Sequence, residues 1–343
     1  MHGTSSKRKI IIGALIALLL IAAFGGVMHF IEKHGEQDEQ YGDTGDWGQD
    51  ESETGSEFTL DFPNTTYVCK DDVTTYLLIG TDAGGEDMGK GFNGELADFL
   101  SLLVLDNTTN KYAFIQIDRN TMANVTVYDE NGEEKGDAYE QICIAHWYGL
   151  DAEQRNENTV KAVSELLGGF PIDGYYTLHM DDIALVNNAI GGVTVEIQED
   201  LTNIDPAFVA GASVHLEDEQ AEKFVRARMN ACEGTNKERM SRQRQYMTSA
   251  YQMMITQLRE SPEYVNDLYD QLNGIIESNG NDRNIGNVAN QLVQLDSVGI
   301  LDIEGKTQVN DTQKDGKEHE EFYTTEDDIV AALKQVINLS IPE

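Results

Sequence analysis

Phe99-Leu-Ser-Leu-Leu-Val-Leu105 is a nearly unbroken apolar run in a chain of 343 residues. Such a run is typical of a strand that is buried on both faces. The polar segment 106–111 that follows is turn-like, and Tyr112-Ala-Phe-Ile-Gln-Ile117 predicts a second strand. Because a short turn joins the two strands, we expect a hairpin within a buried sheet.

Strand and helix patterns alternate on both sides of this hairpin. The other predicted strands are 76–79, 175–178 and 193–197, with one or two short strands near the C-terminus. The predicted helices are 138–149, 155–167, 180–190, 217–229, 236–260, 263–278, 286–296 and 326–338, the last with Thr325 as its N-cap. Helices interleaved with strands predict one α/β domain whose central sheet is covered on both faces.

Residues 10–31 carry no charged side chain other than the titratable His29. As a helix they extend over roughly 33 Å, enough to cross a bilayer core of about 30 Å. Basic residues precede this run, so residues 1–9 are expected in the cytoplasm and the rest of the chain outside. A cleaved signal peptide has a shorter apolar part, and Ala22-Ala-Phe24 is a poor cleavage site. We therefore expect a transmembrane anchor, and a single-pass protein of the cell membrane with its C-terminal domain extracellular.

The segment that follows the anchor differs in composition from the rest of the chain. Residues 32–58 are rich in Asp, Glu and Gly and contain few large apolar side chains. Such a segment does not form a core, and repulsion between its carboxylates keeps it extended. We expect an acidic flexible linker over 32–70 and one extracytoplasmic domain over 71–343.

The charge and the cysteines limit the choice of partners. The chain has 61 acidic and 24 basic side chains and a net charge of −37, whereas binding of DNA or RNA depends on cationic surface, so no nucleic acid is expected. Cys69, Cys143 and Cys232 are an odd number at wide spacing, without a metal-binding pattern. Two interpretations stay open for them: a disulfide between Cys143 and Cys232, or three unpaired thiols.

Five arginines stand out against this acidic background. They lie in Val225-Arg-Ala-Arg228 and in Arg239-Met-Ser-Arg-Gln-Arg244. Arginine is suited to bidentate capture of phosphate, so the cluster indicates a phosphate site. The alternative is a set of salt bridges on a solvated acidic surface.

The spacing of these residues favours convergence. Arg239, Arg242 and Gln243 are three and four residues apart, so one face of the expected helix presents them together. Arg226 and Arg228 converge only if the preceding helix has ended and the chain is extended there. One helix end and the next helix start are thereby able to surround an anion.

Three further polar residues lie at predicted strand ends. Asp82 follows one strand, Asp98 precedes the Phe99–Leu105 strand, and Arg119 follows the next. Functional groups in open α/β sheets lie at such ends. Two carboxylates with a cluster of arginines suit a Mg²⁺-bridged di- or triphosphate, in which the carboxylates bind the metal and the arginines neutralise phosphate oxygens.

Six motifs in order resemble the LytR–CpsA–Psr family over residues 72–260. They are Leu77-Leu-Ile-Gly-Thr-Asp82, Ala97-Asp98, Ile117-Asp-Arg-Asn-Thr121, Ile142-Cys-Ile-Ala-His-Trp-Tyr-Gly149, Val225-Arg-Ala-Arg228 and Arg239-x-x-Arg242-Gln243. The resemblance implies a three-layer α-β-α sandwich with a central mixed sheet and an apolar groove for a lipid tail. It also implies a phosphotransferase that moves a glycopolymer from a polyprenyl-pyrophosphate carrier to peptidoglycan, outside the cytoplasmic membrane and with Mg²⁺ as cofactor.

The family's functional residues carry over to positions of this chain. Asp82 and Asp98 match the metal-side carboxylates, and Asp98, Arg119 and Arg226 are the expected catalytic residues. The resemblance implies a pyrophosphate-binding set of Arg119, Arg226, Arg228, Arg239, Arg242 and Gln243.

Two departures from the family pattern keep a second hypothesis open. Leu96 occupies a position where the family usually has arginine, and Asn120 one where it has aspartate. We expect the side-chain oxygen of Asn120 to hold Arg119 in place. Since both changes remove charge near the site, the alternative is a non-catalytic envelope sensor or scaffold that binds lipid pyrophosphates. His146 is expected to pack in the core and not to act in catalysis.

Overall fold

The computed structural model describes most of the chain beyond the expected linker. The described residues are 57–82, 94–217, 219–227, 236–260, 271–272, 274–279, 291, 294–312 and 318–342. The predicted anchor over 10–31 lies outside them, as does most of the predicted linker. Within the described ranges, no helix is both long and apolar enough to cross a bilayer.

A six-stranded mixed sheet forms the centre, in the order β11-β8-β3-β4-β5-β12. β4 pairs antiparallel with β3 and β5, and β11 with β8, whereas β3 pairs parallel with β8 and β5 with β12. The expected hairpin is therefore confirmed as β4–β5. The strands are β3 (Val73–Thr81), β4 (Ala97–Asp106), β5 (Lys111–Ile117), β8 (Gly174–His179), β11 (Ile276–Ser278) and β12 (Asp296–Asp302).

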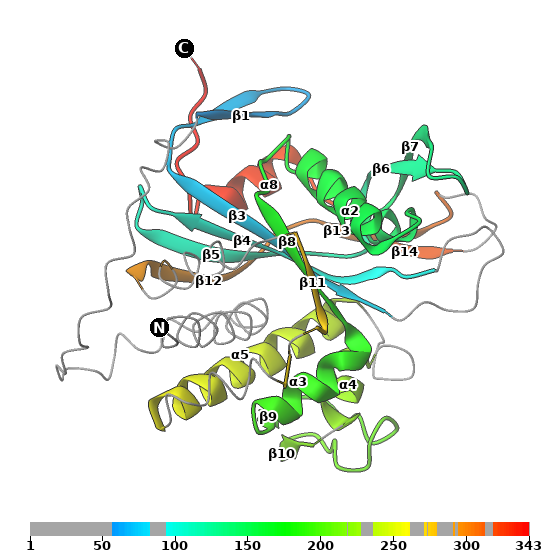
Figure 1. Ribbon diagram of the computed structural model, residues 1–343, viewed down its shortest axis with the longest axis vertical. Coiled ribbons are helices and arrows are strands. Elements are labelled where there is room, and N and C mark those ends of the chain that lie inside the picture. Colours follow the sequence, from blue (N-terminus) through cyan, green and yellow to red (C-terminus); the bar gives the residue numbers. More distant parts are fainter. Residues whose placement is uncertain are drawn as a thin grey trace, which may run out of the picture.

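Helices cover both faces of this sheet (Figure 1). In β4, Leu102 and Val104 belong to one apolar core and Leu103 and Leu105 to the other, because successive side chains of a strand point to opposite faces. Figure 1 shows α2 and α8 on one side and α3, α4 and α5 on the other, so the three-layer arrangement is confirmed. The helices are α2 (Ala152–Leu166), α3 (Ile183–Ala189), α4 (Glu219–Arg226), α5 (Asn236–Glu260) and α8 (Glu326–Leu333).

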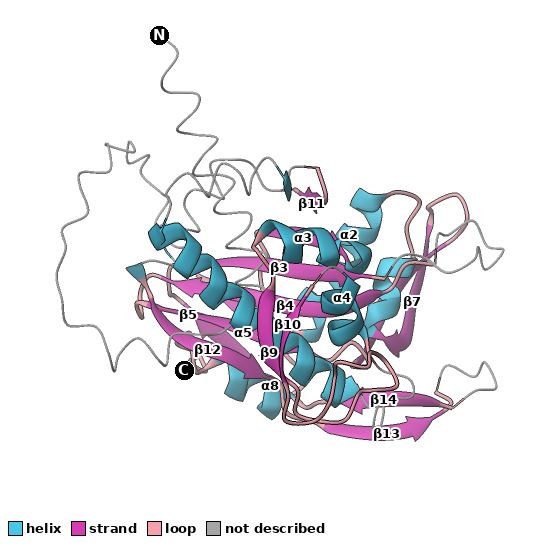
Figure 2. Ribbon diagram, turned by 90° about the horizontal axis from the view of Figure 1, so that it is seen from below, coloured by secondary structure: helices cyan, strands magenta, loops and turns pink. Residues whose placement is uncertain are grey.

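Among the described residues, four hairpins and two short 3₁₀ helices surround this body, and Figure 2 shows β13–β14 at its rim. The hairpins are β1 (Phe58–Asp61) with β2 (Thr66–Cys69), β6 (Met122–Tyr128) with β7 (Glu134–Gln141), β9 (Val193–Glu196) with β10 (Ser213–Leu216), and β13 (Lys306–Asn310) with β14 (His319–Tyr323). The 3₁₀ helices are η2 (Ile142–Trp147) and η3 (Met180–Asp182).

The structure corrects two of the expected boundaries. The linker predicted over 32–70 overlaps the β1–β2 hairpin, which buries Leu60 and Cys69 completely, so residues 57–70 belong to the folded domain. The helix predicted over 138–149 is instead the end of β7 followed by η2. β7 is largely exposed and polar, and its antiparallel pairing with β6 makes it a strand.

The C-terminal third mixes correct and wrong predictions. The predicted helix 263–278 ends in strand β11, and the predicted helix 286–296 is followed by β12 from Asp296 onwards; the remaining described residues of these stretches are few. The last helix is confirmed, and the Thr325 side chain accepts a hydrogen bond from the backbone N–H of Asp328 as an N-cap does. Cys69 and Cys143 are buried and neither is in a disulfide, which speaks against the Cys143–Cys232 pairing considered above; Cys232 lies outside the described residues.

One edge of the sheet collects the predicted site. Strands β3, β5, β8 and β12 run in one direction and β4 in the other. The carboxyl ends of the first four and the start of β4 therefore share an edge. Asp82, Asp98 and Arg119 all lie there, at the ends of three neighbouring strands.

Candidate functional site

Asp98 lies between two buried arginines. Its Oδ1 is 3.0 Å from Arg119 Nε, and its Oδ2 accepts a hydrogen bond of 2.9 Å from Arg239 Nη1. Arg239 Nη2 also donates to the Asp98 carbonyl oxygen at 3.3 Å. The arginine side chains are 9% and 4% exposed and Asp98 is 15% exposed. Two guanidinium groups thus share the Asp98 carboxylate in a place that is largely shielded from solvent.

Asp118 and Asn236 extend this cluster, and sequence analysis missed both. Asn236 donates to Asp118 Oδ1 at 2.6 Å, and its own Oδ1 accepts from Arg239 Nη2 at 2.6 Å. Burial raises the pKa of Asp118, against the opposing effect of hydrogen bonds from the Asn120 backbone and Asn236. The place of Asp118 directly before Arg119 at a strand end was the available signal.

Arg226 forms the second part of the site. It is the last residue of α4, and it donates to Asp82, to Asp181 at 2.6 Å and to Glu222 at 2.6 Å. The helix ends at Arg226, as the convergence of the arginines required. Burial lowers the pKa of Arg226, but the carboxylates of Asp82, Glu222 and Asp181 raise it further, so its pKa is above the usual value.

Asp82 and Asp98 lie at the ends of adjacent antiparallel strands. Thr81 pairs with Ala97, and the Asp82 backbone N–H donates to the Leu96 carbonyl at 3.1 Å. The Asp82 side chain is 39% exposed, more than that of Asp98. The structure therefore brings the two expected carboxylates together at one edge, one open to solvent and one enclosed.

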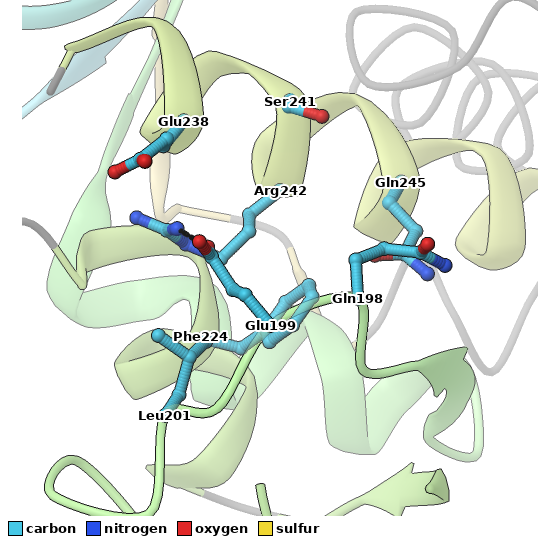
Figure 3. A pocket seen from close by; sticks show the side chains of 8 residues that line it. All are labelled: Gln198, Glu199, Leu201, Phe224, Glu238, Ser241, Arg242 and Gln245. Atoms are coloured by element: carbon cyan, nitrogen blue, oxygen red, sulfur yellow. Dashed lines mark hydrogen bonds and ion pairs between the residues drawn. The ribbon is translucent and has the colours of Figure 1, made fainter. Parts of the chain in front are cut away.

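Arg242 contacts neither carboxylate. Its Nη1 donates to Glu199 and its Nη2 to the carbonyl of Ala227, the residue after α4. A pocket of about 270 Å³ is lined by residues of α4, α5 and the segment after β9. Figure 3 shows Arg242 and Glu199 together among them. The expected place of Arg242 in the pyrophosphate set is thus not supported by its contacts, which hold the chain beyond Arg226. Arg228 lies outside the described residues.

Gln243 is 1% exposed, one helical turn after Arg239 on α5. Its Nε2 has no hydrogen-bond partner among the described residues. A buried donor without a partner is costly, so the amide N–H₂ group of Gln243 is able to donate to a ligand.

Asn120 does not hold Arg119, contrary to expectation. Its Oδ1 accepts from Gln141 Nε2 at 3.1 Å, and Gln141 also donates to the Glu320 carbonyl at 2.8 Å. The turn after β5 directs the side chain of Asn120 toward β7 and β14, while Arg119 reaches Asp98. The departure at position 120 therefore leaves the arginine's ion pair intact.

His146 is 1% exposed and lies in a second polar cluster. Its Nδ1 is 3.1 Å from Thr159 Oγ1 and its Nε2 is 3.7 Å from Glu95, which also pairs with Arg155 at 3.2 Å. Burial lowers the pKa of His146, against the raising effect of Glu95. A neutral, enclosed imidazole is in keeping with the packing role expected for it.

The expected metal rests on Asp82 and Asp98 alone. Among the described residues no group of three or more His, Cys, Asp or Glu side chains is arranged to hold a metal ion. Mg²⁺ usually binds through one or two carboxylates, with phosphate oxygens and water as its other ligands. Two carboxylates on adjacent strands fit that donor set.

Known proteins resemble the chain in sequence. The LytR_cpsA_psr family model matches residues 39–334. A polyisoprenyl-teichoic acid–peptidoglycan teichoic acid transferase TagU of Bacillus mycoides (strain KBAB4) is 28% identical over 183 residues, which are 53% of either chain. The TagU of Bacillus anthracis (strain A0248) is 28% identical over 180 residues, 52% of either chain. The chain therefore matches about half the length of these curated relatives.

Solved structures share the fold. Protein gbs0355 of Streptococcus agalactiae has a TM-score of 0.59 at 20% identity, covering 77% of this chain and 86% of that protein. TagT bound to LI-WTA has a TM-score of 0.54 at 19% identity, with 78% and 89% covered. Since the family model spans the central sheet and every described part of the arginine site, the chain belongs to the LytR–CpsA–Psr family.

Proposed function

We propose that the chain is a phosphotransferase that moves a glycopolymer from a polyprenyl-pyrophosphate carrier to peptidoglycan. The observation that carries this proposal is the Arg119–Asp98–Arg239 cluster, in which two buried guanidinium groups share one carboxylate. The family and the TagU relatives, which are named as teichoic acid transferases, support the same reaction class.

The arginines supply the binding and the stabilisation of charge. A pyrophosphate that enters between Arg226 and Arg239 replaces the carboxylates as their partner. Charge on its non-bridging oxygens shifts in the transition state, and donors already in place stabilise that charge by several kcal/mol. Bound by Asp82 and Asp98, Mg²⁺ would neutralise phosphate oxygens further.

Because Asp82 is more exposed than Asp98, the acceptor is expected to enter the site on the side of Asp82. A sugar hydroxyl of the wall reaches the site from the exposed side, where Asp82 lies. Its oxygen forms a bond to the glycan-side phosphorus, and the bond from that phosphorus to the bridging oxygen breaks. Prenyl phosphate leaves with the bridging oxygen, and the hydroxyl proton passes to Asp82. Asp82 thus orients the acceptor.

The proposal includes the location of the reaction. Residues 10–31 anchor the chain, and the described domain lies on the outer side of the cytoplasmic membrane, where peptidoglycan is assembled. Within this arrangement the carrier lipid stays in the membrane while its pyrophosphate reaches the edge of the sheet.

Turnover of a synthetic prenyl-pyrophosphoryl glycan tests the proposal. Purified chain, Mg²⁺ and peptidoglycan fragments are expected to consume the substrate, and chelator is expected to stop the reaction. Arg239→Ala is expected to lower turnover by about a hundredfold or more. Tight binding by the wild type without any cleavage would instead support the sensor or scaffold, and full activity in chelator would remove the metal role of Asp82 and Asp98.

A further inference from the structure

Gln116 is a buried amide that the site described above does not use. It lies near the end of β5 and is 2% exposed. Its Oε1 accepts a hydrogen bond of 2.8 Å from Arg244 Nη2, whereas its Nε2 has no hydrogen-bond partner among the described residues. A strand that buries an unsatisfied donor loses stability, so the free N–H₂ group indicates a ligand.

Arg244 fixes the direction of this amide. A guanidinium only donates, so the amide oxygen of Gln116 faces Arg244 and the N–H₂ group points away from it. Arg244 Nη2 also donates to Asp302 Oδ1 at 2.5 Å, which pairs its charge and holds it at β12. Arg244, the arginine of the cluster without an assigned role, therefore acts on the site through Gln116.

The free N–H₂ group lies in the layer that contains the phosphate site. Gln116 and Asp118 are two residues apart, so both face α5. Asp118 contacts Asn236 and Gln116 contacts Arg244. Arg239 and Gln243 lie between these two contacts along α5. Two buried amide N–H₂ groups without partners, those of Gln116 and Gln243, thus occur in one layer beside a buried arginine.

We propose that Gln116 is a further substrate-binding residue, whose N–H₂ group donates with Gln243 to an oxygen of the lipid-side phosphate. This inference rests on the proposed function. The glycan and its acceptor enter at the exposed Asp82, so the phosphate that lies deeper, beneath α5, is the one attached to the lipid. That phosphate is the leaving group, and neutral donors there stabilise the charge that it gains.

Binding of farnesyl pyrophosphate and farnesyl monophosphate by isothermal titration tests the inference. Gln116→Met keeps the length of the side chain and removes the donor, and it is expected to weaken both ligands about tenfold. Gln116→Glu places an anion against the phosphate and is expected to weaken them more. Gln308→Met makes the same change at an exposed position and is the matched control, with unchanged affinity.

Arg244 offers an independent test that does not alter Gln116. As a single change, Arg244→Met is expected to weaken binding of the farnesyl ligands about threefold to tenfold, because the Gln116 amide loses its orientation. Added to Gln116→Met, the same change is expected to have little further effect. Equal losses in the two backgrounds would contradict a role of Arg244 through Gln116, and this comparison stands if Gln116→Glu fails to fold.

The outcomes separate the inference from the proposed function. If the wild type binds neither farnesyl ligand, the proposed function fails. If the wild type binds both, and Gln116→Met binds them equally well while remaining folded in thermal unfolding, Gln116 contacts only water, and the inference is overturned while the proposed function stands.

Discussion

Asp98 pairs with two buried guanidinium groups at once, so this residue is expected to affect both the stability and the binding of the site. Asp98→Ala leaves Arg119 and Arg239 buried without their shared carboxylate. Removing one partner of a buried ion pair typically lowers the free energy of unfolding by about 3–5 kcal/mol. We expect a loss of that size in urea unfolding of the variant.

Asp302→Ala is the control for this prediction. Asp302 also pairs with an arginine, Arg244, but both side chains are more than a third exposed, at 44% and 35%. Exposed pairs contribute about 0–1 kcal/mol. Equal losses in the Asp98 and Asp302 variants would contradict the burial argument. Added inorganic phosphate is expected to lower the free energy of unfolding of neither variant. It is expected to restore the stability of the Asp98 variant only in part, because a free phosphate is not fixed to the backbone as the Asp98 carboxylate is.

His146 predicts how stability changes with pH. Its pKa is about 6.5 in the unfolded chain, and burial lowers it in the folded protein. The unfolded state therefore binds more protons below pH 6.5, so stability that is present above this pH is lost as the pH falls toward the lowered value. We expect a loss of up to about 1.4 kcal/mol per pH unit from this group.

The matched variant for this prediction is His146→Gln, which keeps a polar side chain beside Thr159 and does not titrate. His179, whose pKa is raised by Glu277, acts in the opposite direction but is present in both proteins. Thermal unfolding between about pH 7.5 and 5.5 is expected to show the larger decrease in the wild type. The same decrease in both proteins would exclude His146 as the cause.

At the scale of elements, the end of α4 and the start of α5 form one unit. Arg242 joins them through the Ala227 carbonyl, and Glu199 holds Arg242 in turn. Glu199→Gln is therefore expected to weaken farnesyl pyrophosphate binding about threefold to tenfold, although Glu199 contacts neither Asp82 nor Asp98. Arg242→Lys, which cannot reach both partners as a fork does, is expected to resemble it. Unchanged binding in both variants would show that Arg226 is positioned by α4 alone.

The sequence predicted the elements that have a strong period and missed those that depend on tertiary pairing. The β4–β5 hairpin, α2 and the Thr325 cap followed from apolar runs and capping chemistry. The polar strand β7 did not, because its partner β6 and not its own composition makes it a strand. Short β11 is likewise defined by its pairing with β8.

The positions of three site residues could be predicted because they depend on strands with a strong sequence pattern. Asp82, Asp98 and Arg119 follow or precede recognisable strands, so topology alone brings them to one edge. The partner of Asn120 was predicted wrongly, because a neighbour from a distant segment, Gln141, decides it. A distant neighbour, Glu199, likewise decides a contact of Arg242 that the sequence did not indicate. Spacing along a helix or strand gives the face of a side chain but not its partner.

For the molecule as a whole, we propose that the domain lies outside the cytoplasmic membrane. Protease added to intact protoplasts is expected to digest the described domain, because a basic flank precedes the apolar run 10–31. A cytoplasmic protein in the same cells is the control for membrane integrity. Full protection of the domain would contradict both the location and the choice of substrate.

The identity of the lipid product shows whether the protein transfers a phosphoryl group or breaks the sugar–phosphate bond. Purified chain is incubated with a prenyl-pyrophosphoryl glycan, Mg²⁺ and peptidoglycan fragments, and the products are identified by mass spectrometry. The account predicts prenyl monophosphate, together with peptidoglycan that carries the glycan through one phosphate. Release of prenyl pyrophosphate would show that the sugar–phosphate bond breaks instead, and would contradict phosphoryl transfer at the Arg119–Asp98–Arg239 cluster.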